Sequence, residues 1–193
     1  NSDSMLIGDK NALIVAARCS GYGMEYGTSI TCPSCTSTSN LEIDLAEAKQ
    51  PYAGYDAETA EEPLEGVEGP DAAGNYFITL PVSKARFEVK LMTGREEKAF
   101  AKRLETRRKK RQAEAMLTDQ FKTFTLSING VGDLRQMYRF IDNLPVRDSR
   151  FLRNQYQKLS PALNLKHDFV CGECGYEQEV EVPITAQFFW PDA

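Results

Sequence analysis

The sequence predicts an α+β protein in which the two ends of the chain build one four-cysteine site around a central strand-and-helix region. Three observations carry this prediction. Two Cys-x-x-Cys pairs lie far apart, with residues 36–170 between them. Short runs with the alternation typical of β-strands flank each pair. The sequence between the pairs holds both strand and helix patterns.

The composition is that of a globular protein. The chain has 193 residues, of which 41% are hydrophobic and 26% are charged, and these shares are ordinary for a folded domain. The net charge is −5, from 23 Lys and Arg against 28 Asp and Glu, so the chain is not globally basic as many nucleic-acid binders are. No apolar run approaches the roughly 18 residues of a membrane span. The first residue is Asn1 rather than Met, which is typical of a processed or partial product.

The paired cysteines are the candidate metal ligands. Cys32 and Cys35 form the first pair, and Cys171 and Cys174 form the second. A spacer of two residues lets both sulfurs of a pair reach one ion, and zinc prefers four such ligands in a tetrahedron. We therefore expect one structural Zn²⁺ with all four positions filled by protein. Strand patterns before and after each pair predict a zinc ribbon, at residues 28–31, 41–45, 169–170 and 179–184.

Other uses of these cysteines stay open at the level of sequence. Disulfides need an oxidising compartment, which nothing in the sequence indicates. A thioredoxin-like redox site needs a Cys-x-x-Cys that opens a helix, whereas both pairs lie between predicted strands. Inert buried thiols are a third alternative. The fifth cysteine, Cys19, lies near the end of a helix predicted over 10–20, capped by Asp9 and ended by Gly21, and is expected to be a small buried hydrophobe.

Composition divides the chain into four segments that we expect to form one compact, zinc-closed unit. They are 1–49 (helix and first cysteine pair), 50–74 (acidic loop), 75–165 (central strands and helices) and 166–193 (second pair and aromatic terminus). The acidic segment holds three prolines and seven carboxylates without a Lys or Arg. Such a stretch buries little apolar surface, so we expect a loop or mobile insertion, which could also dock a basic partner.

The central segment is predicted to contain strands at 76–80, 86–91 and 124–128 and three helices. Thr93 and Glu96 have capping-box spacing and predict a helix that runs to about Leu117. Asp133 is expected to cap a second helix that closes at Pro145, and a third is expected from Asp148 to Leu159. The last two helices have apolar residues at helical spacing, which are expected to lie in the core.

The helix that begins after Thr93 carries a run of basic residues. The candidate contacts in this run are Lys102, Arg103, Arg107, Arg108, Lys109, Lys110 and Arg111. Such cations can displace counterions from nucleic-acid phosphates, but no interleaved aromatic residues mark a base-stacking platform. A protein partner, an intramolecular contact with the acidic segment and a solvated face are the alternatives. A nucleic-acid partner is not expected, although a nucleic-acid-binding zinc ribbon is the main rival function.

Three large aromatic residues lie almost at the end of the chain: Phe188, Phe189 and Trp190. Chain ends are usually frayed and polar. Either these side chains fold back into the domain or they anchor a partner, since aromatic residues dominate interface hot spots. The two alternatives are compatible, and all three residues are candidate partner contacts.

The ordered set of motifs resembles a family of contractile-tailed phage proteins, the baseplate hub assembly proteins of the T-even type. The resemblance spans about residue 10 to the end. It rests on Arg18-Cys19-Ser20-Gly21-Tyr22-Gly23-Met24-Glu25-Tyr26, Cys32-Pro33-Ser34-Cys35, Leu80-Pro81, Leu91-Met92-Thr93-Gly94-Arg95-Glu96-Glu97, Phe140-Ile141-Asp142-Asn143-Leu144-Pro145, Asp148-Ser149, Cys171-Gly172-Glu173-Cys174-Gly175 and Phe188-Phe189-Trp190-Pro191. Thr36 departs from the pattern, since a glycine commonly follows such a cysteine pair.

The resemblance implies a structural or assembly role in a phage tail baseplate, among other baseplate, hub or tail proteins. It places the protein in the host cytoplasm during assembly and leaves open whether it stays in the finished particle. No catalysis is implied, and the sequence agrees with this. It holds a single histidine and lacks the phosphate-binding, nucleophile-elbow and His-Glu-x-x-His motifs. No small-molecule substrate is expected.

Overall fold

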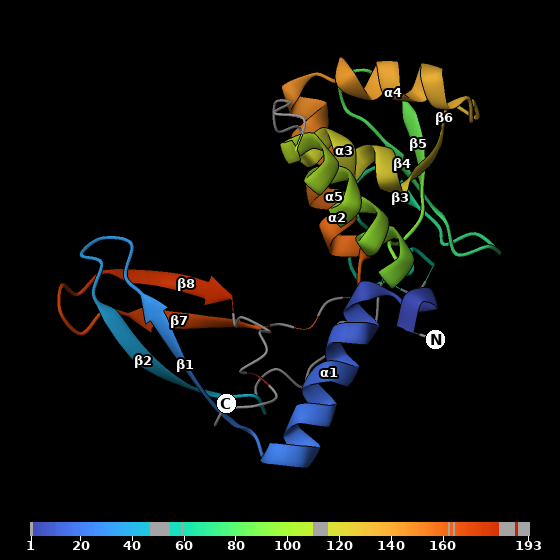
Figure 1. Ribbon diagram of the computed structural model, residues 1–193. Coiled ribbons are helices and arrows are strands. Elements are labelled where there is room, and N and C mark those ends of the chain that lie inside the picture. The colour runs from blue at the N-terminus through green and yellow to red at the C-terminus, as the bar shows by residue number, and fades with distance from the viewer. Residues whose placement is uncertain are drawn as a thin grey trace. The chain divides into compact units, whose positions relative to one another are not determined.

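The computed structural model describes residues 2–46, 55–58, 60–109, 116–161, 163, 165–181 and 188. This part of the chain is an α+β protein, as expected, and it has five α-helices and small antiparallel sheets (Figure 1). It divides into two compact units rather than one. Unit 1 comprises Asn1–Lys10 and Ala53–Pro161, and unit 2 comprises Asn11–Tyr52 and Ala162–Ala193. The first ten residues therefore belong with the central region.

In chain order, α1 is followed by five strands, two helices, one strand, two helices and two final strands. The helices are α1 (Ile7–Tyr22), α2 (Gly94–Lys109), α3 (Met116–Phe124), α4 (Leu134–Asp142) and α5 (Val146–Leu159). The strands are β1 (Glu25–Thr31), β2 (Thr38–Asp44), β3 (Val67–Glu68), β4 (Tyr76–Thr79), β5 (Arg86–Val89), β6 (Thr125–Ile128), β7 (Lys166–Val170) and β8 (Glu177–Glu181). None of the helices that the structure describes is both long and apolar enough to span a bilayer.

Unit 1 is built on a four-stranded antiparallel sheet with the order β3-β4-β5-β6. Alternation along β5 sends Phe87 and Val89 into the core, where both are fully buried. Helices α3, α4 and α5 supply many of the other buried residues of this core. The ring of Phe124 from α3 stacks on that of Tyr156 from α5, with centroids 3.8 Å apart. Strands β4, β5 and β6 confirm the predicted central strands. The predicted α4 cap is also confirmed, because the Asp133 side chain accepts a hydrogen bond from the Gln136 N–H.

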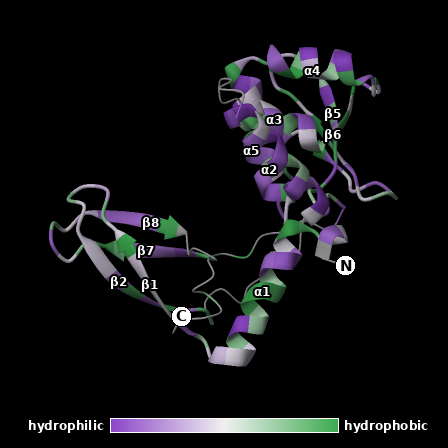
Figure 2. Ribbon diagram, viewed as in Figure 1, coloured by the Kyte–Doolittle hydropathy of each residue, from purple (hydrophilic) through white to green (hydrophobic). Residues whose placement is uncertain are grey.

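The basic helix differs from the prediction at its C-terminal end. Its start is as expected, since the Glu96 carboxylate accepts a hydrogen bond from the Thr93 N–H at 2.9 Å. However, α2 ends at Lys109 and a separate helix, α3, begins at Met116. Helix α2 is hydrophilic almost throughout (Figure 2), whereas α3 buries Phe121 and Phe124. The described residues of the predicted helix therefore form two elements with opposite burial requirements, and residues 110–115 between them lie outside the described part.

Over the residues described, 55–58 and 60–74, the acidic segment is mostly loop, as predicted, but its apolar residues pack into the core of unit 1. Tyr55 is buried in the unit 1 core, and its hydroxyl accepts a hydrogen bond from the Leu64 N–H. Val67 is buried within β3, which pairs with β4. A few well-spaced apolar side chains thus tie this segment to the sheet while its carboxylates remain at the surface. Residues 50–54 and 59 lie outside the described part.

A buried carboxylate fixes the turn between β4 and β5. Asp148, in the first turn of α5, is fully buried. Its two oxygens accept hydrogen bonds from the Val82 N–H at 2.8 Å and the Ser83 N–H at 2.9 Å. Burial alone would raise the pKa of Asp148, but hydrogen bonds from Ser83 and Val82 outweigh it and lower the pKa below its ordinary value. Asp148 therefore holds the turn to α5 as a carboxylate.

Replacing Asp148 by Asn is expected to destabilise unit 1 by about 2–3 kcal/mol at pH 7, because one of two charge-assisted hydrogen bonds loses its acceptor. A lowered folded-state pKa contributes stability above the unfolded pKa of about 3.9, and this contribution is lost as the pH falls. The difference from wild type should therefore shrink between pH 7 and pH 3.5 in urea denaturation. Asp142→Asn, at an exposed position, is the control, and an equal loss at both pH values would contradict this role.

Unit 2 contains the rest of α1 and two hairpins, β1-β2 and β7-β8. Helix α1 begins at Ile7 and ends at Tyr22, so Asp9 lies in its first turn instead of capping it. Gly21 lies within the helix, and Gly23, with φ 82°, follows its end. The buried Arg18 donates hydrogen bonds to the carbonyls of Gly23 and Glu25, which join the helix end to β1.

The main core of unit 2 lies between α1 and the bases of the hairpins. Its buried members are Val15, Tyr26, Ile43, Leu45, Leu165 and Phe188. Cys19 is partly buried and packs against this core, as expected for a small hydrophobe. A second small cluster, of Cys32, Phe169 and Cys171, lies at the cysteine end of the hairpins.

Candidate metal centre

Each cysteine pair lies in the tight turn of one hairpin, and the two turns have the same hydrogen bonds. In the β1-β2 turn, the Thr36 N–H donates to the Cys32 carbonyl at 2.9 Å, and the Cys32 N–H donates to the Ser37 carbonyl at 2.8 Å. In the β7-β8 turn, Gly175 and Tyr176 take the places of Thr36 and Ser37, with both distances 2.9 Å. Sequences far apart in the chain therefore fold into two turns with matching hydrogen bonds, each of which carries two cysteines.

The residue after each second cysteine has a left-handed backbone. Its φ is 61° at Thr36 and 68° at Gly175. Glycine adopts this conformation without steric cost, whereas a β-branched residue does not. Although Thr36 stands where a glycine is common, its turn has nearly the same φ as the turn that contains Gly175. Thr36 also donates a side-chain hydrogen bond to the Cys35 carbonyl at 2.7 Å.

Gly175→Ala is expected to lower the free energy of unfolding of the metal-loaded protein by about 1–2 kcal/mol, because alanine must then adopt a positive φ. Gly172→Ala in the same turn is the matched control. A Cβ at either glycine meets no atom within 4 Å, but only Gly175 has a positive φ. Chemical denaturation followed by circular dichroism measures both changes. Equal effects of the two substitutions would show that the backbone conformation is not what limits this turn.

The four sulfurs form one cluster. Cys32 Sγ lies 3.7 Å from Cys174 Sγ, and Cys35 Sγ lies 3.7 Å from Cys171 Sγ. All four sulfur atoms lie within 4.8 Å of one another. In a regular tetrahedron with Zn–S bonds of about 2.3 Å, neighbouring sulfurs lie about 3.8 Å apart. The arrangement is thus suited to one metal ion.

The alternatives for these cysteines fit the geometry less well. A disulfide needs an S–S distance of about 2.05 Å, and all five cysteines are free thiols. Neither pair opens a helix, since both lie in hairpin turns. The first cysteine of each pair is buried and the second is exposed. Within the described part of the chain, no other group of His, Cys, Asp or Glu is placed to hold a metal ion, and His167 is not part of this one.

Ser37 is a site residue that the sequence analysis missed. Its hydroxyl lies 2.9 Å from Cys35 Sγ and 3.4 Å from Cys171 Sγ, and so contacts both turns. The hydrogen bond between the Ser37 hydroxyl and Cys171 is the main cause that lowers the pKa of Cys171 to about 6. The N–H groups of Cys174 and Glu173 lower it further. The hydrogen bond with Ser37 also lowers the pKa of Cys35. A polar residue two positions after the second cysteine is the only sequence signal for this contact.

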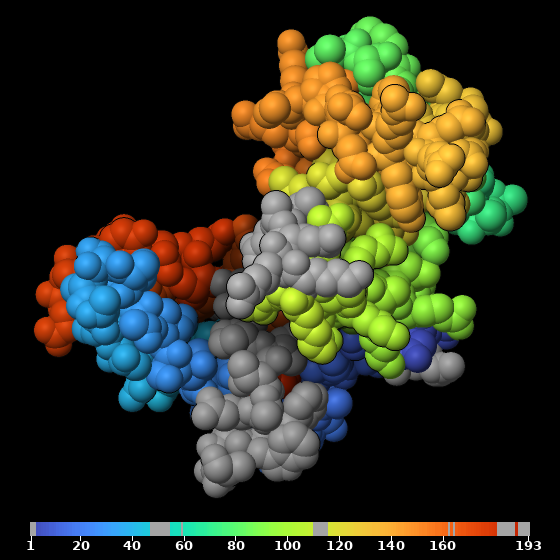
Figure 3. Space-filling model, turned by 45° about the horizontal axis from the view of Figure 1, so that its top comes forward, coloured from blue at the N-terminus to red at the C-terminus, as the bar shows by residue number. Residues whose placement is uncertain are grey.

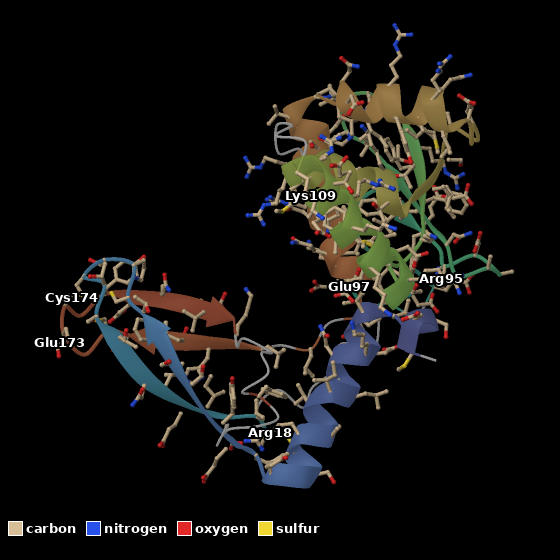
Figure 4. All side chains as sticks on the ribbon, viewed as in Figure 1. Arg18, Arg95, Glu97, Lys109, Glu173 and Cys174 are labelled. Atoms are coloured by element: carbon tan, nitrogen blue, oxygen red, sulfur yellow. The ribbon has the colours of Figure 1, made fainter. Side chains whose placement is uncertain are left out.

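Cys174 titrates in the opposite direction. The Tyr176 N–H lowers its pKa, but the hydrogen bond with Cys35, burial and the other two sulfurs raise it to about 11. Figure 4 labels Cys174 at the turn of the β7-β8 hairpin. Cys35, Cys171 and Cys174 therefore hold their protons with unequal strength. A metal ion replaces these protons when it binds, so metal affinity falls as the pH falls.

The terminal aromatic residues were candidate partner contacts, and for Phe188 the structure corrects this. Phe188 is fully buried, and its ring meets that of Tyr26 edge to face with centroids 4.9 Å apart. It is a core residue of unit 2, because an apolar ring gains more from this enclosed site than from the surface. Phe189 and Trp190 lie outside the described residues.

The basic helix is partly neutralised within the chain. Arg107 Nε lies 2.8 Å from Asp119 Oδ2, a buried carboxylate of α3. Arg107 was predicted to contact a partner, and the structure shows instead that it forms an ion pair within the chain. Lys109 pairs with the exposed Glu105 at 2.7 Å. In the described part of the chain, no carboxylate pairs with Lys102, Arg103 or Arg108. Lys110 and Arg111 lie outside it.

Comparison with known proteins adds no relative. No protein-family model matches the chain, and no curated protein or solved structure matches it. The fold and the site define an α+β protein whose two hairpin turns bring together four cysteines in a cluster suited to one metal ion.

Proposed function

We propose that this chain is a non-enzymatic structural protein whose four cysteines bind one Zn²⁺, so that its two hairpins form a zinc ribbon. The observation that carries the proposal is the cluster of four thiols contributed by two turns far apart in sequence. Thiolates favour zinc over hard cations such as Mg²⁺ and Ca²⁺. Four protein ligands leave no open position for water or a substrate, which is typical of a structural site rather than a catalytic one.

The sheet topology supports a mechanical role for the ion. Hairpins β1-β2 and β7-β8 are separate two-stranded sheets, and an isolated two-stranded hairpin is marginally stable in water. The apolar cluster at the cysteine end is small, with Phe169 buried and Ile30 and Val180 partly buried. When bound, the metal supplies the strong link between the hairpins. The binding free energy of such sites, on the order of 10 kcal/mol, is then also folding free energy.

We further propose that the protein works in the tail baseplate of a contractile phage, in its hub region, through protein–protein contacts. The support is the ordered set of motifs in the sequence, together with the places those motifs occupy. Arg18 joins α1 to β1, Thr93 and Glu96 begin α2, Asp148 holds a turn, and Phe188 fills the core of unit 2. Proteins that share these motifs are expected to share the same structural contacts. The protein would act in the host cytoplasm during assembly.

The test is a map of the chain's neighbours. Exposed lysines are cross-linked in purified tail assembly intermediates and in finished tails, and the linked peptides are identified by mass spectrometry. Cross-links to other baseplate or tail proteins are expected. Internal cross-links without any to a tail component would overturn the phage assignment, while the metal centre would stand on its own evidence.

The rival function, nucleic-acid binding through the basic helix, has a separate test. Titration with duplex and single-stranded DNA across a salt series measures it, because each phosphate contact adds to the salt slope. No binding near physiological salt is expected, since Arg107 and Lys109 already pair with carboxylates. A steep salt slope with micromolar affinity would favour the rival instead.

A further inference from the structure

Helix α5 presents a basic face that the sequence analysis did not single out. Its inward side buries Leu152, Tyr156 and Leu159 in the unit 1 core. Its exposed residues are Val146, Arg147, Arg150, Arg153, Asn154, Gln157 and Lys158. Not one of these is acidic, in a chain with a net charge of −5. Figure 3 shows α4 and α5, in orange, at the surface of unit 1.

Within the part of the chain that the structure describes, α5 differs from α2 because no carboxylate pairs with its arginines. Among the described residues, no carboxylate lies within ion-pair distance of Arg147, Arg150 or Arg153. The one acidic residue of α5, Asp148, is turned inward and holds the 81–83 turn. Asp142, at the end of α4, pairs with Lys122 at 2.5 Å. The positive charge of α5 is therefore available to a partner.

A pocket of about 500 Å³ opens beside these arginines. Its lining residues are Glu65, Pro81, Val146, Arg147, Arg150, Phe151 and Asn154. Pro81 and Phe151 supply apolar walls that are partly buried, and Val146 is 78% exposed at the rim. A hollow of this size with apolar walls admits one or two large side chains.

The walls of the pocket are held by local structure. The Asp148 carboxylate fixes the turn that contains Pro81. On the other side, Gly66 has φ 69°, and a Cβ there would lie 2.9 Å from the Thr79 carbonyl and 3.5 Å from the Phe151 ring. Backbone packing thus sets the Glu65 wall close to α5. A preformed pocket lowers the entropic cost of binding.

We propose that this pocket and the arginines beside it form a docking site for an acidic segment of a partner protein, with one large apolar side chain in the pocket. Arg147 and Arg150 are one helical turn apart, so they can pair with carboxylates on both sides of that anchor. An apolar centre flanked by arginine is typical of protein interfaces. The inference rests on the proposed partner-binding role and adds the surface and the chemistry of the partner.

A nucleic acid fits this surface less well. Glu65 lines the same pocket and would repel phosphates. A highly exposed valine at its rim has no role on a phosphate backbone. Phe151 is partly buried in the pocket wall, so it offers no open platform for a stacked base. An acidic segment can keep its carboxylates near the arginines and away from Glu65, because the apolar anchor sets its register.

Selection from a random 16-residue peptide library, displayed on yeast, tests the proposal with the metal-loaded full chain. Selected peptides are expected to carry Asp or Glu within four residues of a large apolar side chain. Arg147→Glu with Arg150→Glu should weaken their binding at least about tenfold, as expected of residues at an interface centre. Val146→Ser should weaken it about threefold, because the apolar rim contributes less than the charges.

The matched control is the pair Arg135→Glu and Arg139→Glu on α4, which changes the net charge by the same amount at exposed positions outside the pocket. This pair should leave the affinity within about twofold, since screened charges at a distance contribute little. The proposal would be overturned by a library that yields no binders, by equal losses in both pairs, or by a 16-base-pair duplex that binds more tightly than the selected peptides. If the peptide selection failed but cross-links to tail proteins were found, only the docking site on α5 would be ruled out. If the selection succeeded but no cross-links to tail proteins were found, only the phage assignment would be ruled out.

Discussion

Removal of the metal is expected to unfold the two hairpins of unit 2 and to leave the unit 1 sheet folded. The hairpins form separate two-stranded sheets, so without the ion they lose a link worth on the order of 10 kcal/mol. Unit 1 has its own core, which includes the fully buried Ile78, Phe87, Phe124 and Leu152. Hydrogen exchange measured by mass spectrometry before and after a zinc chelator should show lost protection in 25–44 and 166–181 only.

Cysteine variants make the same point without a chelator. Cys174→Ser should lose the metal and reproduce the exchange pattern of the chelated protein. Cys19→Ser is the matched control, because Cys19 packs against the other core of unit 2 and is not one of the four clustered thiols. It should keep one ion per chain. Unchanged protection of both hairpins after metal loss would contradict the mechanical role of the site.

Truncation of Phe188 is expected to have the second-largest effect. Phe188→Ala removes a fully buried ring that packs against Tyr26. Phenylalanine-to-alanine changes in a core cost about 3–5 kcal/mol. The loss should fall on unit 2, and denaturation of the metal-loaded protein followed by exchange in β1 and β2 measures it.

Phe140→Ala provides the comparison for this prediction. Phe140 is 38% exposed on α4 of unit 1, so its removal should cost much less and should leave exchange in unit 2 unchanged. If Phe188→Ala were as mild as Phe140→Ala, then Phe188 would not be a core residue and the terminal aromatics would again be candidate partner contacts.

The parts of the fold that could be predicted from the sequence are those specified by local spacing. A cysteine pair with two residues between its members closes one turn, and the strands beside it follow from alternation. The α4 cap at Asp133 and the start of α2 near Thr93 are likewise set within a few residues. The four-cysteine cluster followed from one long-range assumption, that all four thiols serve one ion, and the structure brings these sulfurs together.

The parts that could not be predicted depend on distant partners. Tyr55 and Val67 are few among many carboxylates, and only the core they enter shows why the acidic segment folds. In the sequence, Arg107 is one of several cations in a basic run, and only the structure shows that it pairs with Asp119 of the next helix. Phe188 could have faced either way, because burial depends on Tyr26, a residue far away in the chain. The α5 face was missed because its arginines are spread at helical spacing.

The most direct test of the proposed zinc ribbon is metal analysis joined to X-ray absorption spectroscopy on protein purified without chelators. One zinc ion per chain is predicted, surrounded by four sulfur neighbours at about 2.3 Å. A chain without bound metal, or an ion with nitrogen or oxygen among its nearest neighbours, would contradict the assignment of Cys32, Cys35, Cys171 and Cys174 as its ligands.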